Sequence, residues 1–176
     1  SGQGVIMRSG NSSKPESLSR LTNRFEIAVS NFGRSCIAMR SNEKAFQAWF
    51  AACVIQEFGL SRVYREVHLD KKELFKGMAP QEFFEGLRAG NELFPDLSIT
   101  WEPDVDTRHT SNRDYSAAEM LAQMAIVTEF KATGSTRIAT SHAQVLRDIQ
   151  KLALFSMALS VFQGSAPSMR GLATYM

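Results

Sequence analysis

Two short apolar runs that carry charged residues constrain this chain most. In the run 94–100, alternation along a strand places Asp96 on one face, and in the run 124–131 it places Glu129 and Lys131 together. A carboxylate and an ammonium on a largely apolar strand are costly to bury unless they are paired or bound to a ligand. The pattern therefore predicts two neighbouring strands that bring a charged site into an apolar sheet.

The composition indicates a single globular domain in a reducing compartment. The 176 residues are 44% hydrophobic and 22% charged, which is enough to build one core. Two cysteines, Cys36 and Cys53, are too few for a disulfide scaffold, and we expect buried thiols. Three histidines are scattered singly, which argues against a closed Cys/His zinc site; they are His68, His109 and His142.

The sequence predicts neither a membrane span nor a secretory signal. The most apolar stretch, 152–162, is far shorter than the roughly 20 residues of a membrane span. The first residues, which lack an initiator Met, do not resemble a secretory signal and are typical of a cleavage scar or an internal fragment. We therefore expect an intracellular, cytoplasmic, soluble protein.

Apolar periodicity predicts a sheet with helices packed around it. The expected helices and strands are helices at 17–32, 42–58, 80–90 and 141–162, and strands within 61–69, 93–101, 122–132 and 171–176. Ser41 or Asn42 can cap the second helix, and Gly59 can end it. Between two strands, the polar stretch 102–119 is long enough to predict a functional or a disordered loop.

The leading part of the chain differs from the rest in charge and composition. Residues 1–16 predict a mobile tail, residues 17–40 a helical segment, and residues 41–176 the main domain. Residues 1–40 hold six basic and two acidic side chains, so this segment could contact phosphates. A solvated helix face behind a flexible tail is the alternative interpretation.

The charged residues of the two runs suit one kind of chemistry. Hydrolysis of a phosphodiester benefits from a divalent cation that binds a phosphate oxygen and a water together. Mg²⁺ prefers hard oxygen ligands, which Asp96 and Glu129 could supply from neighbouring strands. Lys131 could then position the attacking water or balance charge that develops on the phosphorus centre.

The motif Pro95-Asp96, followed by Glu129-Phe130-Lys131, resembles the P-D…(D/E)-x-K signature of the restriction-endonuclease-like nuclease superfamily. The order of the expected elements is also similar: a helix, three strands that bear the motif, a helix and a further strand. The resemblance covers about 41–176. It implies an α/β fold with a central mixed sheet flanked by helices, to which the chain adds an N-terminal helix.

The resemblance also implies roles for particular residues. Asp96 and Glu129 would bind Mg²⁺ or Mn²⁺, and Lys131 would assist the water. A glutamate on the preceding helix often joins such a site, and Glu43 is the candidate, with Glu57 behind it. The helix after the motif presents one stripe at helical spacing: Gln144, Arg147, Asp148 and Lys151. The expected nucleic-acid contacts are Gln144, Arg147, Lys151 and Arg137.

Three alternatives remain open at this point. Asp96 lies farther from Glu129 than in the usual hairpin of that superfamily, so Asp104 or Asp106 could replace it if the strand runs later. The leading hypothesis is a metal-dependent nuclease, of DNA rather than RNA, acting as a homodimer or as part of a longer chain. The rivals are a catalytically inactive nuclease-like domain that binds nucleic acid or serves in assembly, and an unrelated α/β interaction domain in which Glu129 and Lys131 pair.

Overall fold

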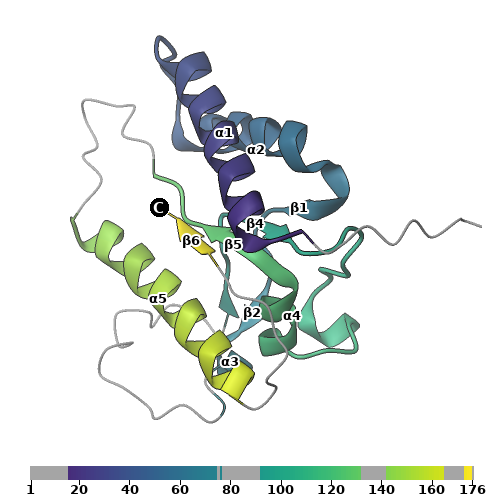
Figure 1. The fold of residues 1–176 in the computed structure, drawn as a ribbon. Helices are drawn as coiled ribbons and strands as arrows, with labels where there is room; N and C mark the ends of the chain where they lie inside the picture. The colour runs from purple at the N-terminus through teal and green to yellow at the C-terminus, as the bar shows by residue number, and fades with distance from the viewer. Residues whose placement is uncertain (1–15, 75, 77–91, 132–141, 165–172, 176) are drawn as a thin grey trace, which may run out of the picture.

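A four-stranded mixed sheet forms the centre of the computed structural model, which describes residues 16–74, 76, 92–131, 142–164 and 173–175 (Figure 1). The strands lie in the order β1 (Val63–Tyr64), β4 (Leu97–Thr100), β5 (Met124–Thr128) and β6 (Ala173–Tyr175). β4 runs antiparallel to both β1 and β5, whereas β5 and β6 are parallel.

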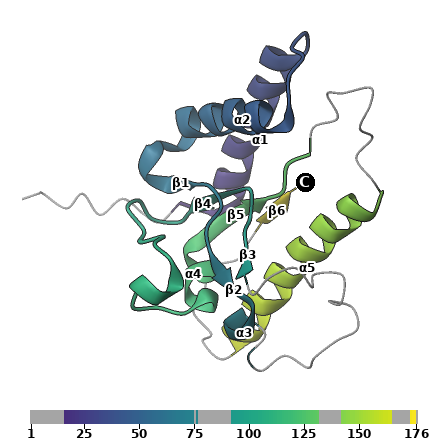
Figure 2. The same ribbon diagram turned by 180° about the vertical axis from the view of Figure 1, so that it is seen from behind.

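Helices and a small second sheet surround these strands. The remaining elements are α1 (Leu18–Cys36), α2 (Glu43–Phe58), η1 (Leu60–Arg62), α3 (Lys71–Leu74), η3 (Thr110–Asn112), α4 (Ala117–Gln123), α5 (His142–Gly164) and the antiparallel pair β2 (Leu69–Asp70) and β3 (Glu92–Leu93). Figure 2 shows this pair of short strands next to α4, away from α1 and α2. Within the described residues, no helix combines the length and apolar character that a transmembrane span requires.

Local signals set the bounds of the first two helices. Asn42 caps α2, because its side chain accepts a hydrogen bond from Ala45 N at 2.9 Å. Gly59 ends α2 with φ of 80°, a conformation that glycine adopts without strain. Ser17 caps α1, which extends beyond its expected end at residue 32 as far as Cys36.

The core is divided by the sheet into two apolar clusters, one on each face. α1 and α2 cover one face of the sheet, and α4 and α5 cover the other (Figure 1). Fully buried side chains in the two clusters include Phe25, Val54 and Ile126 on the first side and Met120 and Phe155 on the second. Burial of this apolar surface from both sides holds the helices against the strands. The expected α/β class, a mixed sheet flanked by helices, is confirmed.

The strands are shorter than the sequence predicts, for identifiable reasons. Glu66 has φ of 50° and divides the expected strand 61–69 into β1 and the start of β2. Pro95, which has no N–H to donate, separates β3 from β4 within the expected strand 93–101. The expected strand 122–132 is β5 alone.

A short helix replaces the end of the expected loop. Residues 117–123 form α4, so Ala122 and Gln123 are helical rather than extended. Ser116 and Glu119 form a capping box at its start, each side chain bonding the other's backbone N–H.

Several predictions concern residues outside the described part of the chain. The expected helix 80–90 lies there entirely, and the expected tail does so apart from Glu16. The Glu16 carboxylate lies 2.8 Å from Arg24 Nη1 and 3.0 Å from Arg62 Nη1, so it anchors the start of α1. Both cysteines of the chain, Cys36 and Cys53, are free thiols, and they are half-buried rather than buried as expected.

Candidate active site at the ends of β4 and β5

The pairing of β4 with β5 brings the two halves of the motif together. Because the strands are antiparallel, with Leu97 opposite Thr128, the start of β4 and the end of β5 share one edge of the sheet. Asp96 directly precedes β4, and its Oδ2 accepts a hydrogen bond from Phe130 N at 2.7 Å. Glu129 directly follows β5, so Glu129 and Lys131 lie just beyond the strand rather than on it.

Glu129 is the most enclosed charged group of this cluster. Its side chain is 1% exposed, and its Oε2 lies 2.7 Å from the ammonium Nζ of Lys151. Its other oxygen, Oε1, is buried and has no hydrogen-bond partner among the residues described. Burial raises the pKa of Glu129 to about 8; the Lys151 ammonium opposes this shift, and the carboxylates of Asp96 and Asp148 add to it.

Lys131 and Asp96 complete the centre of the site. Lys131 Nζ lies 3.3 Å from Asp148 Oδ2 and 3.6 Å from Glu43 Oε1. Burial opposes the charge on Lys131, but these carboxylates outweigh it and raise the pKa of the ammonium. Burial also raises the pKa of Asp96, despite the hydrogen bond from Phe130 N.

The charge balance and the donor atoms fit a hard divalent cation. The cluster holds four carboxylates and two ammonium groups, so full ionisation leaves an excess of negative charge. Oxygen-rich sites of this kind suit Mg²⁺ and Mn²⁺. The buried Oε1 of Glu129 has no hydrogen-bond partner in the described chain, and such an ion could bind this oxygen.

The structure separates the alternatives among the predicted acids. Glu43, in the first turn of α2, joins the site through Lys131. Glu57 lies at the opposite end of that helix, where its carbonyl accepts a hydrogen bond from Arg24. Asp104 and Asp106 follow β4 in the loop, and Asp106 pairs with Arg108 at 2.7 Å. Of the three candidate aspartates, Asp96 is therefore the one that meets Glu129.

The predicted stripe on α5 divides between the site and the surface. Asp148 and Lys151 point into the cluster, and Lys151 Nζ also donates to Phe94 O at 2.9 Å. The Lys151 side chain is only 16% exposed, so the structure places it among the carboxylates rather than on an open nucleic-acid surface. Gln144 and Arg147 are exposed on α5. Arg137, the fourth predicted contact, lies outside the described residues.

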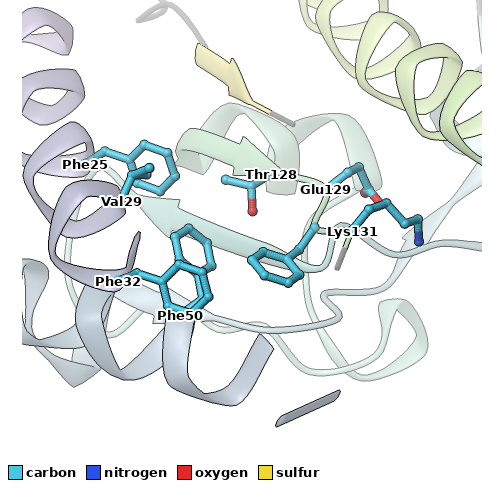
Figure 3. Close-up of a pocket in the computed structure, with 8 residues that line it drawn as sticks. Phe25, Val29, Phe32, Phe50, Thr128, Glu129 and Lys131 are labelled. Carbon is cyan, nitrogen blue, oxygen red and sulfur yellow. The ribbon is translucent and has the colours of Figure 1, made fainter. Parts of the chain in front are cut away.

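A pocket with aromatic walls adjoins the charged groups, and no sequence pattern predicts it. Its volume is about 250 Å³, and besides Glu129 and Lys131 it is lined by Phe25, Val29, Phe32, Phe50, Thr128 and Phe130. Figure 3 shows the Glu129 and Lys131 side chains at one end, extending away from Phe25 and Phe32. A pocket with apolar walls and charged groups at its rim can hold an aromatic or apolar part of a ligand.

A second cluster of ligand atoms lies outside this site. Glu92 Oε2 is 2.9 Å from His68 Nδ1, and Glu92 Oε1 is 2.6 Å from His109 Nε2. The three groups have their ligand atoms within 4.8 Å of one another and could hold a metal ion. The sequence pattern did not predict this group, because His68 and His109 are 24 and 17 residues from Glu92 and no short ligand spacing marks it.

The raised pKa of Glu129 predicts a pH-dependent stability in the absence of metal. Between the unfolded value of 4.5 and the folded value of about 8, the native state binds more protons than the unfolded state. The free energy of unfolding should therefore fall as pH rises through this window, by up to about 1.4 kcal/mol per pH unit. Glu129→Gln cannot titrate and should lose this part of the pH dependence.

Urea unfolding of both proteins in EDTA, from about pH 4 to about pH 9, measures the effect. The variant should gain stability relative to wild type as pH rises, and the difference should level off above the folded pKa. If the difference in the free energy of unfolding between the two proteins did not change with pH, ionisation of Glu129 would not destabilise the fold.

Comparison of the chain with family models, with curated proteins and with solved structures gives no match.

Proposed function

We propose that the chain is a divalent-metal-dependent nuclease that hydrolyses phosphodiester bonds, with DNA as the favoured substrate. The observation that carries the proposal is the meeting of Asp96, Glu129 and Lys131 at one edge of the sheet. Phe130 N donates to Asp96 across the paired strand ends, which brings the first acid beside the second. Glu43 and Asp148 add carboxylates around Lys131.

Each of these residues has a distinct part in the proposed reaction. Asp96 and Glu129 would hold Mg²⁺ or Mn²⁺, the ion that brings a phosphate oxygen and a water together and offsets their negative charge. The Lys131 ammonium would orient the water or stabilise the charge that develops on the phosphate oxygens. Asp148 and Glu43, as its partners, would direct Lys131 toward the acids.

The arrangement of elements is consistent with the superfamily resemblance. α2 precedes three antiparallel strands, β1, β4 and β5, and α5 leads to β6, which pairs in parallel with β5. Apart from the β2 and β3 pair, the short helices α3 and α4 and the 3-10 turns, which lie between these elements, the order is helix, three strands, helix and strand, which supports the resemblance. A fold of this kind does not by itself decide between DNA and RNA, so both are assayed as substrates.

One observation favours a second candidate, an inactive nuclease-like domain that binds nucleic acid or serves in assembly. Lys151 Nζ already lies 2.7 Å from Glu129 Oε2 and supplies positive charge without a metal ion. Against this interpretation, one ammonium leaves Oε1 of Glu129 without a partner in the described chain and leaves Asp96 unmatched by a direct ion pair there.

The deciding experiment is cleavage of end-labelled DNA and RNA, single- and double-stranded, by tag-free protein. After treatment with EDTA, the protein is assayed without metal and then with Mg²⁺ or Mn²⁺ as the sole divalent ion. We expect cleavage that depends on the added ion and prefers DNA. Calorimetric titration with Mn²⁺ in parallel measures binding separately from turnover.

The outcomes separate the two candidates. Cleavage that persists in EDTA would contradict the metal mechanism. Nucleic-acid binding without any cleavage under all metal conditions would favour the inactive module. Preference for RNA would leave the reaction intact and correct the substrate.

A further inference from the structure

Three segments far apart in the sequence converge on the His68, Glu92 and His109 cluster. His68 directly precedes β2, Glu92 begins β3, and His109 directly precedes η3 in the loop after β4. The β2 and β3 strands pair with Asp70 opposite Glu92, which fixes His68 beside Glu92. The long loop, which the sequence marks as functional or disordered, contributes His109.

The ring nitrogens that face the centre are identified by their contacts. His68 presents Nδ1 and His109 presents Nε2, one to each oxygen of the Glu92 carboxylate. The opposite nitrogen of His109, Nδ1, lies 3.0 Å from Ser111 Oγ. Without an ion, Nδ1 also accepts a hydrogen bond from Ser111 N at 3.3 Å. A metal at Nε2 would move the ring proton to Nδ1, where Ser111 Oγ could accept it in place of that contact, and such an outer partner commonly orients a histidine ligand.

The surroundings hold the ligands in place yet leave them accessible. The His68 ring packs edge-on against the Phe94 ring, with 4.5 Å between their centroids. Arg113 donates from Nη2 to His68 O at 3.1 Å and from Nη1 to Arg108 O at 3.2 Å, which ties the loop to the strand beside the cluster. The side chains of His68, Glu92 and His109 are 38%, 27% and 46% exposed, so an ion can reach them from solvent.

The donor set selects a class of ion. Two imidazoles and one carboxylate are typical ligands of Zn²⁺ and of neighbouring transition metals, whereas Mg²⁺ prefers oxygen. In the carboxylate cluster at Asp96 and Glu129 the donors are all oxygens, so the two sites should differ in the metal they prefer.

We propose that His68, Glu92 and His109 form a zinc site that fastens the loop after β4 to the β2 and β3 pair. The ion would replace the hydrogen bonds that Glu92 makes to the two rings and would cross-link three segments at once. Because it binds the folded arrangement and not the dispersed ligands, it should stabilise the protein. This proposal stands independently of nuclease activity.

The test uses the tag-free full chain and the metal alone. After chelation and buffer exchange, calorimetric titration with Zn²⁺ in excess Mg²⁺ should show one ion per chain. At a hundredfold excess of Zn²⁺ over its dissociation constant, the melting temperature should rise by about 5–10 °C. Co²⁺ in place of Zn²⁺ should give visible absorption bands that report nitrogen coordination.

Matched variants assign the ligands. His109→Ala and Glu92→Gln should each weaken Zn²⁺ binding by at least about a hundredfold, since loss of a direct ligand exceeds the cost of losing an outer partner. His142→Ala, which removes the exposed histidine at the start of α5, should bind Zn²⁺ as wild type does.

Either of two results would overturn the proposal: the absence of Zn²⁺ binding by wild type, or binding and Co²⁺ bands that survive both ligand variants. Glu92→Gln keeps the size of the side chain, so it still tests the site if His109→Ala fails to fold. Both readouts are independent of cleavage, so failure here is distinguishable from failure of the proposed nuclease.

Discussion

Asp96→Asn should lower metal-dependent cleavage by about a thousandfold and weaken Mn²⁺ binding. The change removes one of the two acids proposed to hold the ion, and with it the charge that attracts the cation. The amide keeps an oxygen that can still accept the hydrogen bond from Phe130 N, so the paired ends of β4 and β5 should stay together. The loss should therefore come from chemistry and not from unfolding.

The chain provides its own matched control in a second Pro-Asp pair. Asp104 follows Pro103 as Asp96 follows Pro95, but it is exposed in the loop with φ of 57°. Asparagine tolerates this left-handed conformation, so Asp104→Asn should fold normally and cleave at the wild-type rate. Initial rates and Mn²⁺ calorimetry on both variants measure the contrast. Equal losses in both, or a loss confined to Asp104→Asn, would contradict the proposed site.

The helices could be predicted where local signals determine them. The α2 helix carries its own cap at Asn42, its apolar period and its stop at Gly59, and all three act within the segment. The expected elements do not include α4 although Ser116 and Glu119 match a capping box, because the start of the helix falls in the expected loop 102–119 and its last two residues fall in the expected strand 122–132. The breaks at Glu66 and Pro95 depend on backbone conformations that period-two alternation does not reveal.

The candidate site could be predicted only as far as its motif. Strand pairing was enough to bring Asp96 toward Glu129, since the two runs become antiparallel neighbours in the sheet. The partner of each charge could not be derived in that way. Lys151 reaches Glu129 from α5, and this contact depends on how α5 packs on the sheet. In the second cluster, His109 joins Glu92 through a loop whose course depends on tertiary contacts.

The positions of the two lysines bear directly on the mechanism. Lys131 contacts Glu43 and Asp148, whereas Lys151 contacts Glu129. If Lys131 acts on the water or the developing charge, Lys131→Met should lower kcat by roughly a hundredfold to a thousandfold. Metal affinity should stay the same or increase, because the change removes a positive charge near the carboxylates.

This separation of turnover from metal binding distinguishes Lys131 from the acids, whose loss should lower both. Methionine retains the apolar stem of a side chain that is 27% exposed, so the packing beside α5 should be preserved. Lys44→Met, at an exposed position on α2, is the matched control and should leave both quantities unchanged. Single-turnover cleavage and Mn²⁺ calorimetry on the two variants provide the measurement. Normal cleavage by Lys131→Met, together with loss of cleavage in Lys151→Met, would contradict the role proposed for Lys131. The ammonium that serves the reaction would then be that of Lys151 on α5, beside Glu129.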